Sequence, residues 1–204
     1  MRIRQHVNPL RSEYLNIDLA PVAMREAWPT EVELGSAEAF FLMERAVEDP
    51  QVNYVGVEIR RELVEQTNAI FEERGLSQVQ SVFANVSVDL PRLFPRGNVR
   101  RFFINFPDPW FKGRQKKRRV VSEELVDDLW QCLSLSGEVH VATDIFDIAL
   151  DAMAALERET PRRFVNMVMP WTFVRSSQFV ARSRRERHCE EMGIKIWRLV
   201  YRKV

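Results

Sequence analysis

Short apolar runs alternate with amphipathic helical segments along most of this 204-residue chain, and this alternation limits the fold more than any other feature. A strand that is buried on both faces is a continuous apolar run, whereas a helix has apolar residues every three or four positions. Parallel strands need a crossover connection, which is usually a helix. The pattern therefore predicts an α/β fold, with helices on both faces of a mostly parallel sheet.

The expected strands before residue 143 lie at residues 31–34, 54–58, 79–84, 100–106 and 138–142. The expected helices lie at residues 38–47, 60–73, 122–132 and 146–157, with a proline-marked helical turn before residue 100. Two more strand-like segments, residues 164–168 and 194–201, are separated by an arginine-rich stretch without a hydrophobic helix. We therefore expect an antiparallel pair that closes one edge of a seven-stranded sheet.

The first thirty residues contain three prolines and no periodic apolar pattern. We expect residues 1–30 to form an irregular N-terminal arm and residues 31–204 to form a single domain, because a chain of this length can bury one core.

The formal net charge is only +1, and the two cysteines, Cys132 and Cys189, lack the spacing of a disulfide framework or a metal site. No apolar stretch approaches the length of a membrane span, and the first residues lack the apolar segment of a signal peptide. We therefore expect a cytoplasmic protein that uses no metal. The sequence leaves open whether it is a monomer or a homodimer.

Polar residues and a glycine follow five successive strands of the predicted sheet. They are Gly35, Glu58, Asn85, Asp108 and Asp144. Ligands of such sheets bind outside the carboxyl ends of the strands. The sequence therefore predicts one binding site along this rim. Taken singly, Asn85 is more often a helix cap or turn residue, and Asp144 is more often a cap at the start of a helix.

The first turn favours a nucleoside ligand without phosphates. Glu58 follows Gly35 by 23 residues, and an acid at this place can accept hydrogen bonds from both hydroxyls of a ribose. The turn itself, Gly35-Ser36-Ala37-Glu38-Ala39, lacks a full set of glycines, and Glu38 would repel a pyrophosphate. These features argue against NAD or ATP. The alternative is an ordinary turn with a surface glutamate.

A stiff proline loop leads into a cationic ribbon. Asp108 lies between two prolines in Phe106-Pro107-Asp108-Pro109-Trp110, and six of the eight residues from Lys112 to Arg119 are basic. Proline cannot donate to a ladder and restricts the residue before it, so the loop must leave the sheet in a fixed shape. The alternatives to a role in a functional site are that Asp108 is an exposed turn residue and that Trp110 closes the core.

Two basic patches in a chain of near-zero net charge favour a polyanionic partner. The second patch contains Arg182, Arg184, Arg185 and Arg187, which could also form a solvated face. In the first patch, the side chains expected to hold backbone phosphates of a nucleic acid are Arg114, Lys116, Lys117, Arg118 and Arg119.

Together these motifs resemble the bacterial tRNA (guanine-N7-)-methyltransferase family, which uses S-adenosylmethionine. The resemblance runs from about Val32 to Tyr201 and is most specific in the proline loop and the basic run that follows it. Similar segments also occur at Val55–Glu58 and Ala142–Asp144, and the opening residues 4–10 are similar to those of some members. The resemblance implies a class I, Rossmann-like methyltransferase fold.

The resemblance also implies roles for individual residues. Its cofactor-binding positions correspond to Glu33, Gly35, Glu58, Asn85 and Asp108, and Asp108 would be catalytic where cofactor and substrate meet. Its substrate-binding positions correspond to Lys112, Asp144, Ser183, Arg184 and Glu186. The last three align with a Thr-x-Phe/Tyr-Glu element of the family, whose aromatic residue is missing here. Two glycines of the family's first turn are also replaced, and Asn85 stands where an aspartate is common.

The implied activity is methylation of guanine N7 in tRNA, at position 46 of the variable loop. One alternative is a non-catalytic RNA-binding protein whose altered first turn no longer holds cofactor. Another is an enzyme of the same fold that acts on a different nucleophile, although a small substrate would have no use for two basic patches.

Overall fold

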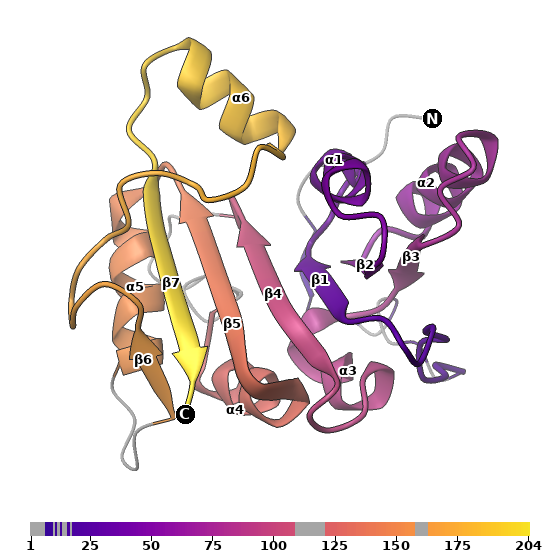
Figure 1. Ribbon diagram of the computed structural model, residues 1–204, viewed down its shortest axis with the longest axis horizontal. Helices are drawn as coiled ribbons and strands as arrows, with labels where there is room; N and C mark the ends of the chain where they lie inside the picture. Colours follow the sequence, from indigo (N-terminus) through magenta and orange to yellow (C-terminus); the bar gives the residue numbers. More distant parts are fainter. Residues whose placement is uncertain are drawn as a thin grey trace.

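The computed structural model describes residues 7–9, 11, 13, 16, 18–108, 121–157 and 163–204 (Figure 1). The strands are β1 (Thr30–Leu34), β2 (Asn53–Glu58), β3 (Val79–Phe83), β4 (Val99–Asn105), β5 (Leu133–Thr143), β6 (Phe164–Asn166) and β7 (Trp197–Lys203). The helices are α1 (Phe40–Glu48), α2 (Arg61–Glu73), α3 (Val86–Leu93), α4 (Glu123–Cys132), α5 (Phe146–Glu157) and α6 (Arg184–Glu191). None of the helices in these ranges combines the length and apolar character that a membrane span requires.

The described strands form one seven-stranded sheet in the order β3-β2-β1-β4-β5-β7-β6. The five strands from β3 to β5 pair in parallel, and β7 pairs antiparallel with both β5 and β6. Figure 1 shows β7 running opposite to β4 and β5, with α6 beyond the ends to which those two strands point. The predicted mostly parallel sheet with an antiparallel C-terminal edge is confirmed.

Helices cover both faces of the sheet because alternate strand residues point in opposite directions. On one face, Val32 and Leu34 of β1 belong to a core cluster with residues of α3, α4 and α5. On the other face, Tyr54 of β2 and Phe103 of β4 pack with residues of α1 and α2. Phe41 of α1 meets Phe103 edge to face, with ring centroids 4.8 Å apart.

Two segments differ from the sequence prediction. β5 begins directly after α4, because Leu133 takes an extended conformation at the helix end and no loop intervenes. The pattern also failed to predict α6, a polar helix of which only Glu186 and Cys189 are buried. The apolar stripe on which helix prediction depends is therefore missing. The Ser183 hydroxyl accepts a hydrogen bond from the Glu186 N–H, and this Ser-x-x-Glu spacing was the available signal.

The described part of the N-terminal arm forms no named helix or strand before Thr30, and hydrogen bonds fasten it to α3 and β3. Val22 donates to the Leu93 carbonyl at 2.9 Å, and the Asn16 side chain donates to the Phe83 carbonyl at 3.0 Å. The division into an arm and a single domain over residues 31–204 stays a prediction.

One buried acid pairs with three arginines at the amino-terminal end of the parallel strands. Glu31 of β1 is fully buried and lies 3.0 Å from Arg45 of α1, 2.7 Å from Arg100 and 2.6 Å from Arg101 of β4. Burial raises the pKa of Glu31, but the charges and hydrogen bonds of the three arginines lower it more, so the net shift is downward. The carboxylate therefore ties α1, β1 and β4 together.

We expect Glu31→Gln to destabilise the fold strongly, because it leaves three guanidinium groups without their shared counter-charge. Losing one partner of a buried ion pair costs about 3–5 kcal/mol. Urea denaturation of the purified variant measures this loss. Glu65→Gln on the exposed side of α2 is the control and should change stability by less than about 0.5 kcal/mol. A loss below about 1 kcal/mol for Glu31→Gln would contradict a central role for this cluster.

Candidate functional site

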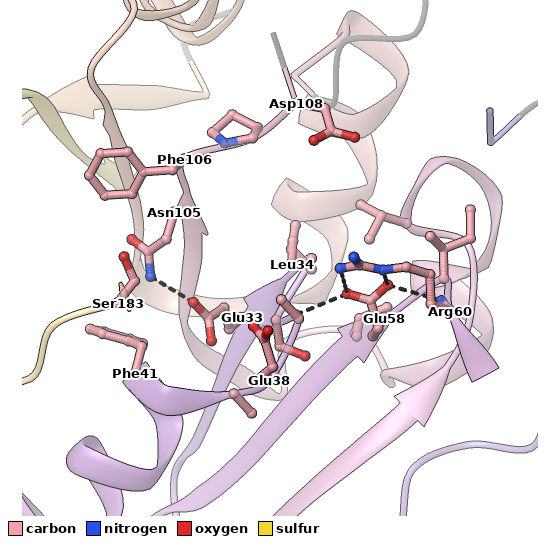
Figure 2. A pocket seen from close by; sticks show the side chains of 18 of the residues that line it. Glu33, Leu34, Glu38, Phe41, Glu58, Arg60, Asn105, Phe106, Asp108 and Ser183 are labelled. Atoms are coloured by element: carbon pink, nitrogen blue, oxygen red, sulfur yellow. Dashed lines mark hydrogen bonds and ion pairs between the residues drawn. The ribbon is translucent and has the colours of Figure 1, made fainter. Parts of the chain in front are cut away.

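A cavity of about 620 Å³ opens at the carboxyl ends of β1, β2 and β4 (Figure 2). Its walls also include the start of α3, one side of α6 and two residues of the N-terminal arm. Among the residues singled out from the sequence, the cavity brings together Glu33, Gly35, Glu58, Asn85, Asp108, Ser183 and Arg184. Their functional roles stay predictions, but their common location agrees with the expected rim.

Two other predicted residues do not line this cavity. Asp144 is paired with Arg185 of α6. Glu186 is buried, lies 2.6 Å from Arg198 of β7, and borders a second cavity of about 60 Å³. The remaining predicted residues lie outside the described residues. They are Lys112, Arg114, Lys116, Lys117, Arg118 and Arg119, together with Trp110.

Glu33 presents an unsatisfied acceptor in the cavity. The Asn105 amide donates to its Oε1 at 2.9 Å, whereas its buried Oε2 accepts no hydrogen bond within the described part of the chain. Burial raises the pKa of Glu33 to about 8, with further raising by the charges of Glu58 and Glu186, although the Asn105 hydrogen bond opposes the shift. A buried, unpaired carboxyl oxygen is costly, so this site is suited to a ligand that donates a hydrogen bond or carries positive charge.

Glu58 is held by four N–H donors. Its Oε2 accepts from the Ala37 backbone N–H at 2.9 Å and from the Arg60 Nη2 at 2.9 Å. Its Oε1 accepts from the Arg60 backbone N–H at 2.9 Å and from the Arg60 Nε at 2.7 Å. The carboxylate is thus fixed in orientation at the end of β2, only 2% exposed, and faces the cavity.

The turn after β1 keeps the shape of a glycine-rich turn although two of its residues are alanines. Gly35, Ala37 and Ala39 have φ of 78°, 47° and 53°, all in the left-handed region that favours glycine. Beneath the turn, a Cβ added to Gly56 of β2 would lie 2.4 Å from the Ser36 Oγ. The missing side chain of Gly56 therefore lets the turn lie directly on the neighbouring strand.

The chain turns sharply as it leaves β4. Phe106 has φ of 49°, its N–H donates to the Ala142 carbonyl at 2.7 Å, and its ring packs against Ala142, Cys189 and Ile196. This anchored residue directs Pro107 and Asp108 to the cavity wall (Figure 2). The predicted exit of the proline loop from the sheet is present as far as Asp108.

Asn85 acts as a helix cap. Its Oδ1 accepts from the Ser87 N–H at 3.1 Å, and its Nδ2 donates to the Pro9 carbonyl at 2.7 Å. The capping alternative is therefore confirmed, and the side chain also holds the N-terminal arm against the cavity. A direct contact with cofactor stays a prediction.

The arginines of the second basic patch are all paired with acids in this structure. Arg184 pairs with Glu38, Arg185 with Asp144, and Arg187 with Glu44 of α1. Arg182 lies 2.9 Å from Glu190, while its backbone N–H donates to Glu44. The patch is therefore a set of ion pairs that fasten α6 and the segment before it over α1 and the cavity, rather than a free cationic face.

Sequence reasoning missed several residues that border the cavity or orient its acids. They are Val7, Pro9, Arg60, Asn105, Phe106 and His188. Asn105 stands at a strand end beside the one that carries Glu33, and this position was a signal for it. Nothing in the pattern indicated that His188 faces the cavity, because α6 itself was not predicted.

A family model described as "Putative methyltransferase" matches residues 27–199. Among curated relatives, a tRNA (guanine-N(7)-)-methyltransferase of Synechococcus sp. (strain JA-3-3Ab) is 37% identical over 97% of this chain and 84% of its own length. The enzyme of the same name from Microcystis aeruginosa (strain NIES-843 / IAM M-2473) is 33% identical over 99% of this chain and 98% of its own. The chain belongs to the tRNA (guanine-N(7)-)-methyltransferase family.

Solved structures support the fold of this methyltransferase family member. Geranyl diphosphate C-methyltransferase from Streptomyces coelicolor A3(2), solved with Mg²⁺, geranyl-S-thiolodiphosphate and S-adenosyl-L-homocysteine, matches with a TM-score of 0.57 at 14% identity, over 92% of this chain and 72% of its own. Precorrin-6y C5,15-methyltransferase from Geobacter metallireducens GS-15 matches with a TM-score of 0.56 at 15% identity, over 85% of this chain and 78% of its own. At these identities the likeness concerns the fold alone, and the predicted class I methyltransferase fold is confirmed.

The raised pKa of Glu33 makes stability depend on pH. The Glu33 carboxyl group has a pKa of about 8 in the folded protein and a reference pKa of 4.5. Below pH 4.5 it is protonated in both the folded and the unfolded chain, so it does not change the free energy of unfolding. As pH rises from 4.5 toward 8 the folded protein loses stability, because the unfolded chain releases this proton more readily than the folded one. We expect Glu33→Gln to flatten the pH dependence of Tm between pH 5 and 8 and to raise Tm at pH 8. Glu62→Gln on the exposed face of α2 is the control. Parallel curves for Glu33→Gln and wild type would contradict the shift.

Ala37, one of the two alanines with positive φ in the turn, is a site where a substitution can stabilise the protein. Ala37→Gly should raise the free energy of unfolding by up to about 1 kcal/mol, because glycine adopts positive φ without strain. Ala154→Gly inside α5 is the matched control and should lower stability by about 1 kcal/mol. Chemical denaturation measures the change in the free energy of unfolding for both variants. Equal losses of stability in the two would refute strain at Ala37.

Proposed function

We propose that this chain transfers a methyl group from S-adenosylmethionine to N7 of a guanine in tRNA. The observation that carries the proposal is the single cavity in which Glu33, Glu58 and Asp108 lie at the ends of β1, β2 and β4 in a member of this family. The cytoplasm is the compartment in which this activity would be used. The family resemblance further implies position 46 of the variable loop as the target.

The residues present fit the cofactor. Glu58 stands at the end of β2, where an acid accepts hydrogen bonds from a ribose diol, and the unpaired Oε2 of Glu33 suits an ammonium group. Glu38 also lines the cavity, so a ligand without phosphates is favoured on this side. When bound, S-adenosylmethionine supplies an electrophilic methyl group on a sulfonium. Glu33, Gly35 and Glu58 would hold it, with Asn85 supporting the arm.

Asp108 supplies the electrostatic part of the reaction. Guanine N7 carries an in-plane lone pair and no proton, so no general base is needed. The purine becomes cationic as the methyl group arrives, and a carboxylate fixed on the cavity wall stabilises that charge. The same group can accept hydrogen bonds from the guanine N1 and N2 atoms, which orients N7 for attack.

The tRNA would approach from the side of α6 and the proline loop. N7 of a guanine in folded tRNA must be exposed before it reacts, so we expect the target nucleotide to leave its stack and enter the cavity. Ser183 and Arg184 border the entrance, and the side chain of Arg184 is 68% exposed. The basic residues from Lys112 to Arg119 would hold phosphates beside it.

We expect Asp108→Ala to lower kcat for tRNA methylation by at least about a hundredfold, because it removes the charge that stabilises the cationic product. Binding of tRNA should change little. Transfer of labelled methyl groups to unmodified tRNA measures the first effect, and a filter-binding titration measures the second. Asp18→Asn in the N-terminal arm is the control.

Near-wild-type turnover in the Asp108 variant would remove this residue from the mechanism. Mapping of the labelled base tests the product itself. Labelling of an atom other than guanine N7 would favour an enzyme of the same fold with another nucleophile. Tight tRNA binding with no detectable S-adenosylmethionine binding would favour a non-catalytic RNA-binding protein.

A further inference from the structure

The side chain of Arg60 occupies the edge of Glu58 that a ribose would need. A carboxylate offers about four lone-pair positions, and four N–H donors already fill them here. Two of those donors are backbone groups, those of Ala37 and Arg60, which belong to the fold. The other two, Nε and Nη2 of Arg60, form a planar fork that spans Oε1 and Oε2 at 2.7 and 2.9 Å.

A ribose diol and a guanidinium fork present the same pattern to a carboxylate. Each directs two parallel donors at the two oxygens, and both cannot be accommodated at once. We infer that Arg60 is a built-in competitor of the cofactor, which occupies the diol position of Glu58 in the ligand-free protein and must leave when a nucleoside binds. This inference rests on the proposed use of S-adenosylmethionine.

The local structure permits the exchange. The Arg60 backbone N–H and the Ala37 N–H keep the Glu58 carboxylate oriented after the fork departs. The Arg60 side chain is 17% exposed and lines the cavity, so it can move without opening the core. Figure 2 shows the guanidinium directed into the cavity rather than into the protein interior.

The displaced guanidinium stays among acids. Burial lowers the pKa of Arg60, but the hydrogen bonds and charge of Glu58, followed by the charges of Asp108 and Glu38, give a net rise. Both of these carboxylates line the same cavity, and Glu38 is already paired with Arg184. Release from Glu58 therefore leaves the guanidinium charged and close to these acids.

The preference for a complete ribose comes from Glu58 itself. A ligand with both hydroxyls replaces both charge-assisted hydrogen bonds of the fork. A 2′-deoxy ligand replaces only one and leaves a buried carboxylate oxygen short of a partner, which is costly. The cost of displacing Arg60 is the same for both ligands, so the competitor lowers both affinities by the same factor.

The test is calorimetric titration of the full chain with S-adenosylhomocysteine, which has no sulfonium charge for Arg60 to repel. We expect Arg60→Gln to bind about tenfold more tightly than wild type, a difference of about 1.4 kcal/mol. Arg61→Gln, which alters the neighbouring arginine stacked on Phe83, is the matched control and should leave the affinity unchanged. Arg60→Lys keeps the charge but not the planar fork, and should bind several-fold more tightly than wild type.

Equal or weaker binding by both Arg60 variants, with wild-type binding intact, would overturn the inference and show that the fork supports Glu58 for the ligand. Binding by no variant at millimolar ligand would instead defeat the proposed function. The 2′-deoxy form of the ligand gives a second readout, because both ligands must displace Arg60 and Arg60→Gln should therefore tighten the binding of both by about the same factor. If Arg60→Gln does not fold, the affinities for S-adenosylhomocysteine and for its 2′-deoxy form are compared between Arg60→Lys and wild type.

Discussion

Parallel pairing of β1 with β2 on one side and β4 on the other is the constraint on which the rest of the structure depends. Register places Glu33 beside Gly56 of β2 and Phe103 of β4, so the strand ends that carry Glu33, Glu58 and Asn105 converge. The opposite end of β1 holds Glu31 among its arginines. One five-residue strand thus carries a saturated buried acid at its beginning and an unsatisfied one near its end.

The two glutamates have different surroundings: those of Glu31 stabilise the fold, and those of Glu33 suit a ligand. Glu31 is surrounded by cations that the fold supplies, and its environment favours the charged form. Among the described residues, Glu33 has one hydrogen-bond partner, the Asn105 amide, and its pKa is raised mainly by burial. The turn after Glu33 is also unfavourable in itself, since Ala37 and Ala39 have left-handed backbone conformations that glycine would adopt without strain. Left-handed alanines and an unpaired carboxyl oxygen lie together around the cavity, as is usual for sites whose partner is a ligand. Positive φ also occurs at Ser136 and Trp171, and buried side-chain nitrogens without a partner among the described residues occur in Trp130 and Arg202.

The sequence predicted the sheet well because its strands are continuous apolar runs and its helices have clear apolar stripes. It also placed Gly35, Glu58, Asn85 and Asp108 on one rim, since parallel strands end on the same side. It did not predict α6, because that helix buries almost no apolar surface. Nor could spacing show that Arg60 turns back onto Glu58, or that Glu186 pairs with Arg198, because both depend on side-chain conformations set by distant neighbours.

The ion pairs of α6 change what its arginines can contribute to an encounter with RNA. A free arginine cluster gains affinity when the nucleic acid releases condensed counterions, and this gain weakens steeply with salt. Here a phosphate must first displace Glu38, Glu44 or Asp144 from its arginine, so binding of RNA to the helix would replace one anion by another. The displaced carboxylates would then repel the same phosphates. Association through α6 would therefore depend less on ionic strength than its three arginines alone suggest, and it would loosen the contacts that hold the helix over the cavity.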